Sequence, residues 1–67
     1  MNSSLIEIIG KAIAAARLAG LDQGEQRSTA LAVLLATDPS LTPGVARVLV
    51  EQLYAVGAAN ADARLAA

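Results

Sequence analysis

Aliphatic side chains recur at spacings of three and four residues in three segments of this chain, which places each set on one face of an α-helix. No segment alternates apolar and polar residues in the way that is typical of a half-buried strand. The spacing predicts helices over residues 5–19, 23–37 and 43–58. Short connections favour antiparallel neighbours, so we expect an all-α fold, a small three-helix bundle.

Capping residues mark where the predicted helices begin. Ser4 and Glu7 have the spacing of a capping box, in which each side chain bonds the backbone N–H of the other residue. Asp22 and Glu25 repeat that spacing before the second helix. Pro43 fits the first turn of the third helix, where its missing N–H costs nothing. These signals support the three predicted starts.

The ends of the predicted helices are marked by residues that interrupt a helix. Gly20 tolerates left-handed geometry, and the residue before Pro39 avoids the helical region. From Gly57 onward the pattern fades into small, Ala-rich sequence. We therefore expect one helical domain over residues 1–67, with a partial extension of the third helix toward Asn60. Residues 58–67 then form a frayed or partly helical tail that could be flexible.

The predicted core takes two aliphatic residues from each helix. These residues are Ile9, Ile13, Leu31, Leu34, Leu49 and Leu53. On the third helix, Val45, Val48 and Val56 fall on the same face as Leu49 and Leu53, with Gln52 among them. The sequence thus predicts that this valine-rich face is the buried one.

Several apolar residues fall outside the predicted core faces. Leu18 lies on the polar side of the first helix, and Val33 lies off the apolar stripe of the second. Val50 and Tyr54 lie one turn apart on the predicted outer side of the third, with Arg47 beside them. Small proteins expose some aliphatic residues in any case, but an aromatic ring and an arginine beside aliphatics are favoured at interface centres. We predict that these five residues form a protein interface, and that Tyr54→Ala weakens association while helix content stays intact.

The residue types exclude most catalytic chemistry. The chain has no His and no Cys, and its carboxylates are explained by caps, loops, a surface pair and the tail. We therefore expect no enzyme activity, no catalytic residue, no cofactor, no metal site and no small-molecule substrate. A net charge of −1 with five Lys and Arg residues lacks the clustered cations that bind nucleic acid.

A 67-residue chain with one aromatic residue and no disulfide has little with which to stabilise a monomer. We expect a non-enzymatic helical protein–protein interaction module that self-associates as a homodimer or a larger homo-oligomer. The alternative is a small phage- or mobile-element-encoded inhibitor or regulator that binds a host protein.

A third possibility is a protein that lies on a membrane surface through its Ile-rich first helix, but only Lys11 and Arg17 supply cations there. The longest wholly apolar run, residues 30–36, is far shorter than the ~20 residues that span a bilayer, so we expect no membrane partner. The lack of cysteine is compatible with a reducing cytoplasm. Heavy use of Ala, Leu and Gly is typical of GC-rich bacterial or phage genomes.

Overall fold

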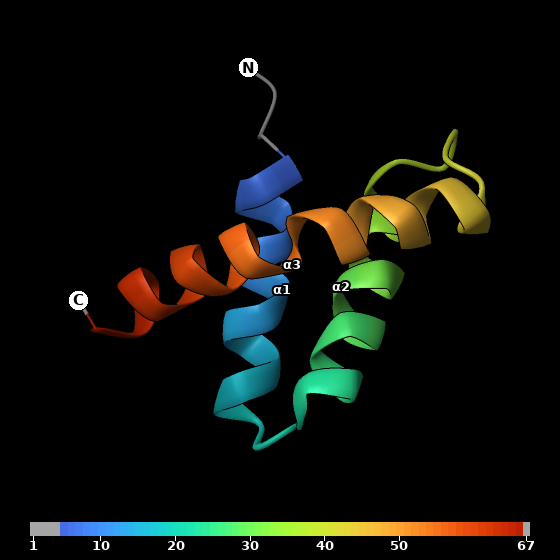
Figure 1. The fold of residues 1–67 in the computed structure, drawn as a ribbon. Coiled ribbons are helices and arrows are strands. Elements are labelled where there is room, and N and C mark those ends of the chain that lie inside the picture. The colour runs from blue at the N-terminus through green and yellow to red at the C-terminus, as the bar shows by residue number, and fades with distance from the viewer. Residues whose placement is uncertain (1–4, 67) are drawn as a thin grey trace.

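A computed structural model describes residues 5–66, which form three helices: α1 (Leu5–Leu18), α2 (Gln23–Thr37) and α3 (Pro43–Ala66). Figure 1 shows α1 and α2 running in opposite directions, joined by a short loop, with α3 lying across both. Every pair of helices is in contact. This arrangement confirms the prediction of a small all-α three-helix bundle.

The helices form two layers. The molecule measures 32 × 28 × 18 Å, and a helix with its side chains is about 10 Å across, so its shortest dimension fits two helices. The α1–α2 pair makes one layer and α3 makes the other (Figure 1). A helix in a two-layer fold has one face covered by the other layer, and nothing within the described chain covers the opposite face of α3.

The helix boundaries follow from the capping residues. Asp22 accepts a hydrogen bond from the Glu25 backbone N–H (2.8 Å), and Glu25 accepts one from the Asp22 backbone N–H (3.2 Å), which confirms that capping box. Gly20 has a φ of 80°, and the N–H of Leu21 bonds the carbonyl of Ala16, as in a Schellman motif. The other predicted capping box begins at Ser4, which lies outside the described residues.

The loop between α2 and α3 also uses side chains to satisfy the backbone. The carboxylate of Asp38 accepts bonds from the backbone N–H and the hydroxyl of Ser40, and so closes a turn around Pro39. The hydroxyl of Thr42 then accepts a bond from the Val45 N–H at 3.3 Å and caps the start of α3. Local hydrogen bonds therefore set the point at which α3 begins.

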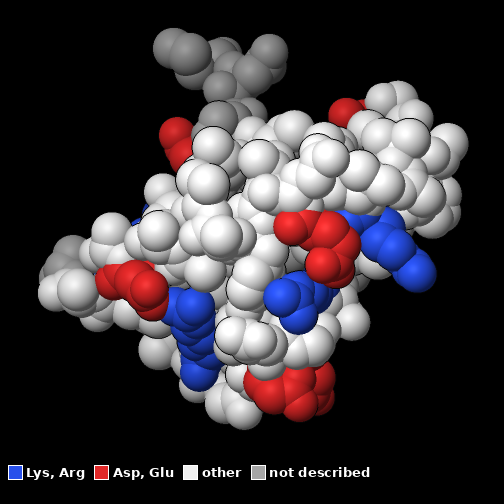
Figure 2. Space-filling model, in the orientation of Figure 1, with Lys and Arg blue, Asp and Glu red and all other residues white. Residues whose placement is uncertain are grey.

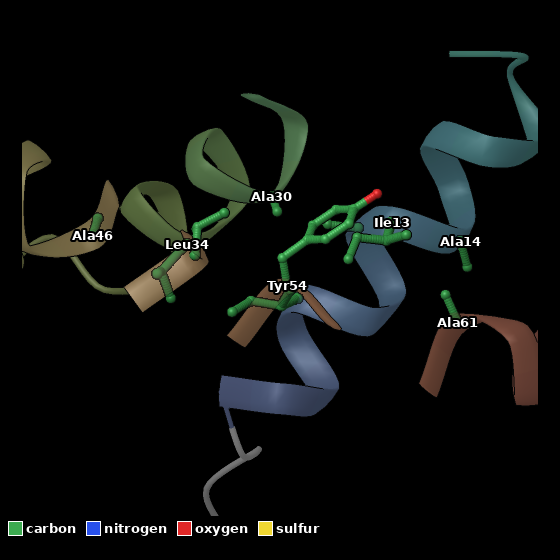
Figure 3. Packing of buried hydrophobic residues seen from close by; sticks show 10 residues of the cluster. Ile13, Ala14, Ala30, Leu34, Ala46, Tyr54 and Ala61 are labelled. Atoms are coloured by element: carbon green, nitrogen blue, oxygen red, sulfur yellow. The ribbon is translucent and has the colours of Figure 1, made fainter. Parts of the chain in front are cut away.

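The α1–α3 contact depends on small residues. Ile9 and Ile13 of α1 are fully buried, as predicted, and Ile9 lies directly over Gly57. A Cβ atom at Gly57 would lie only 2.6 Å from Ile9 Cγ2, so this position has no room for a side chain. Further along the same contact, Ala14 and Ala61 point toward one another (Figure 3). Small side chains thus allow the two helices to approach closely.

The prediction of which face of α3 is buried was wrong. The buried residues of α3 are Ala46, Val50, Tyr54, Gly57 and Ala61. The predicted core residues Leu49 and Leu53 are only partly buried, as is Leu31 on α2, although Leu34 is fully buried. Both faces of α3 are apolar, and the face that carries Gly57 and Ala61 is the one that fits closely against α1.

The third helix extends beyond the expected end at residue 58 and continues to Ala66. Its last turns have partners: Ala61 is fully buried, and Asp62 pairs with Arg17 of α1. Within the helix, Arg64 Nε donates to Asn60 Oδ1 at 2.8 Å. Of the two expectations for the tail, the structure therefore shows the helical one up to Ala66.

We expect Gly57→Ala to lower the free energy of unfolding by about 1–3 kcal/mol, because the added methyl group would overlap Ile9. Gly44→Ala is the matched control in the same helix, since a Cβ there meets nothing within 4 Å. Gly44→Ala should leave stability unchanged or raise it by up to about 1 kcal/mol. Urea unfolding followed by circular dichroism measures both; equal effects of the two variants would contradict the close contact.

Candidate functional site

The outer face of α3 carries a row of exposed apolar side chains. Val45, Val48 and Val56 are 51%, 53% and 49% exposed, which is high for aliphatic side chains on a folded helix. We call this face the outer strip, and it consists of Val45, Val48, Gln52, Ala55, Val56, Ala59 and Ala63. Gln52 is its one polar member, and the strip contains no charged residue.

Charged groups lie beside the outer strip and not within it. In Figure 2 the upper surface, where α3 lies, is largely white, and most of the visible charged atoms gather below it. Glu51 is turned toward α2, where its carboxylate lies 3.7 Å from Arg27 Nε. Covering the exposed half of each valine would contribute on the order of 1 kcal/mol to association. The outer strip can therefore bind another apolar surface without first desolvating a charge.

The five predicted interface residues do not form one surface. Leu18 is 78% exposed at the end of α1, Val33 is exposed on α2, and Arg47 is exposed on α3. Val50 and Tyr54, in contrast, are buried between the helices, so their predicted outward placement was wrong. The exposed valines were missed because the sequence analysis placed them in the core. Gly57 was the signal for the correct face, since a glycine inside a helix often marks a close backbone contact.

Tyr54 belongs to a polar network that joins all three helices. Its hydroxyl donates to Gln26 Oε1 at 2.8 Å, inside the core. Arg17 Nε donates to the same oxygen at 3.3 Å, and Gln26 Nε2 donates to the Leu21 carbonyl at 3.0 Å. Arg17 also pairs with Asp62 near the end of α3. Gln26 is the one buried polar residue of the described chain, and each of its polar atoms has a partner. Tyr54 is therefore a structural residue.

A hollow of about 290 Å³ lies between α2 and α3. Arg27 and Ser28 of α2 line it together with Arg47 and Glu51 of α3. The guanidinium of Arg27 lies over the Tyr54 ring, 4.4 Å from its centroid, and its Nε has no hydrogen-bond partner although that atom is buried. The nearest counter-charge is Glu51, and the remaining lining offers no base or activated nucleophile. The hollow thus has mixed charge and the geometry of a surface groove.

Within residues 5–66, no three His, Cys, Asp or Glu side chains form a group that could hold a metal ion. None of α1, α2 and α3 combines the length and apolar character needed to cross a membrane. Comparison with known protein families, with curated proteins and with solved structures finds no match. Any functional proposal must therefore be based on the surfaces of the chain itself.

We expect Tyr54→Phe to lower the free energy of unfolding by about 1 kcal/mol, because it removes one buried hydrogen bond while Arg17 still serves Gln26. Tyr54→Ala should cost about 3–5 kcal/mol through the cavity that it leaves, a large part of the stability of a domain this small. Thermal unfolding measures both. Helix content that is unchanged in Tyr54→Ala would contradict this and would restore the placement expected from sequence.

Proposed function

We propose that this chain is a non-enzymatic helical module that self-associates through the outer strip of α3, most simply as a homodimer. The observation that carries the proposal is which face of α3 is buried and which is exposed. Val45, Val48 and Val56 are turned outward, whereas the buried residues of α3 are Ala46, Val50, Tyr54, Gly57 and Ala61. Three valines on one face of the helix are thus left about half exposed to water.

The chemistry of the strip favours a second copy as the partner. A face without charge does not select a partner of opposite charge, whereas a second copy offers an apolar strip of the same length and shape. A twofold axis would place the same residues on both sides of the contact, which is the commonest arrangement in homo-oligomers. The chain contains no cysteine, which is compatible with a reducing cytoplasm. We include a cytoplasmic location in the proposal.

The length of α3 allows an extended contact with a second copy. A standard interface buries roughly 800 Å² per partner, which is about a fifth of the 4101 Å² surface of this chain. A helix of 24 residues is about 36 Å long, and the outer strip runs along it from Val45 to Ala63. Association would also raise the apparent stability of a small domain by mass action, because the partner binds only the folded form.

The first test is the mass of the protein in solution, measured by sedimentation from about 1 μM to about 1 mM, the range that covers weak to moderate affinities. We expect a dimer whose dissociation constant lies within or below this range. Val48→Glu should dissociate it, since each interface would then bury two unpaired carboxylates. The thermal unfolding of the monomeric variant should stay cooperative, because Val48 makes little contribution to the core.

Leu18→Glu is the matched control, because Leu18 is a more exposed apolar residue that lies on α1, outside the strip. We expect it to remain dimeric. A wild-type chain that stays monomeric at every concentration would overturn the proposal and would leave the outer strip to a different protein. Dissociation by Leu18→Glu but not by Val48→Glu would show that the interface lies elsewhere on the molecule.

A further inference from the structure

We infer that two copies of α3 pair in an antiparallel arrangement, with Gln52 of each copy at the twofold axis. The inference rests on the proposed self-association and specifies its geometry. Along the outer strip, Val45, Gln52 and Ala59 are spaced seven residues apart, with Val48 and Val56 between them. That spacing keeps a seam of side chains facing a partner helix. Gln52 is the midpoint of the seam.

The sizes of the side chains set the direction of pairing. The first half of the seam carries Val45 and Val48, and the second half carries Ala55, Ala59 and one valine, Val56. In a parallel pair, valine would meet valine at one end and alanine would meet alanine at the other. The distance between helix axes depends on the side chains at the contact, so such a pair would be too wide at one end or poorly packed at the other.

An antiparallel pair centred on Gln52 balances these sizes. Val45 of one copy then faces Ala59 of the second copy, and Val48 faces Val56. The level that pairs Val45 with Ala59 and the level that pairs Val48 with Val56 thus each contain at least one valine. The helices can therefore keep a constant separation, which gives close packing over the whole seam.

The polar residue at the centre fixes the register of the pair along the seam. At a twofold axis, the side-chain amide of each Gln52 can donate to the carbonyl oxygen of the other, so that both amides are paired. A shift along the seam would place each amide against an aliphatic side chain and leave it unsatisfied, at a cost of about 1–3 kcal/mol. A single polar residue in an apolar seam is known to fix register in this way.

The charges that flank the seam do not oppose this pairing. Glu51 lies near the axis, where two like charges would approach one another, but each Glu51 is paired with Arg27 of its own chain. Toward the end of the helix, Asp62 is paired with Arg17. Both carboxylates are thus compensated within one copy, before any second copy approaches.

Disulfide cross-linking tests the geometry, because the natural chain has no cysteine and each introduced thiol is unique. The full-length variants are Val45→Cys, Gln52→Cys and Ala59→Cys, with Leu18→Cys as the control outside the strip. We expect Gln52→Cys to cross-link with itself on mild oxidation. Val45→Cys and Ala59→Cys should each cross-link poorly with themselves, since a disulfide requires Cα atoms within about 7 Å. When the two variants are mixed, the yield of the disulfide between them should exceed the yield from either variant alone by at least about tenfold. Mass spectrometry identifies the mixed product.

The outcomes separate the geometry from the proposed function. Efficient cross-linking of Val45→Cys with itself would show a parallel pair and overturn the inference, while self-association through the strip would stand. A dimeric mass without any cross-link from the strip would overturn the outer strip as the interface. A monomeric mass for the wild-type chain would overturn the proposed function itself, and the geometry with it.

Gln52→Leu provides a second readout. We expect the dimer to tighten by roughly tenfold, because an aliphatic side chain replaces a polar one in an apolar seam. The register should loosen at the same time, so that a shift by one heptad brings Val48 of the two copies together, and Val48→Cys combined with Gln52→Leu gains a cross-link with itself. Gln23→Leu, an exposed glutamine of α2 outside the strip, should change neither property. Weaker association of Gln52→Leu, or an unchanged cross-linking pattern, would contradict the central role of Gln52.

Discussion

The close contact between α1 and α3 at Gly57 is the constraint on which the rest of the structure depends. Ile9 occupies the space that a side chain at residue 57 would need, so the two backbones approach one another. A Cβ atom at Gly10 would likewise overlap the side chain of Asn60. Once α3 is held in this rotation, Ala46, Gly57 and Ala61 must face inward, and Val45, Val48 and Val56 must face water. The exposed apolar surface is thus a direct result of how the core is packed.

The small side chains between α1 and α3 fill little of the space toward α2. One aromatic residue, Tyr54, fills it. Figure 3 shows the Tyr54 ring between Ile13 of α1 and Ala30 of α2. Its hydroxyl reaches Gln26, which in turn binds the α1–α2 loop through Leu21. A buried polar network of this kind fixes the relative positions of helices, because any other arrangement would leave its members unpaired.

The sequence predicts the elements of this fold well because local chemistry sets them. Asp22, Glu25 and Gly20 act within a few residues of their own positions, so the structure has α1 and α2 within one residue of the predicted bounds. The rotation of α3 is different, since its two faces are similarly apolar and the choice between them is made by Ile9, far away in the chain. The same distance effect explains why Val50 and Tyr54 were expected on the outer side of α3, since the periodic pattern placed Leu49 and Leu53 in the core instead. The periodicity of apolar residues leaves open which face of α3 is buried, and the fit of that helix against α1 decides it.

The contact between α1 and α3 joins distant parts of the chain, as the pairing of Arg17 with Asp62, 45 positions apart, illustrates. This separation has a consequence while the protein is being synthesised. As the chain leaves the ribosome, α1 emerges first and α3 follows after both loops. Until then Ile9 and Ile13 have no α3 to cover them, and an exposed aliphatic face is a site for chaperones or for aggregation. The face of the molecule that is most deeply hidden in the finished fold is therefore the one that stays uncovered longest while the protein is being made.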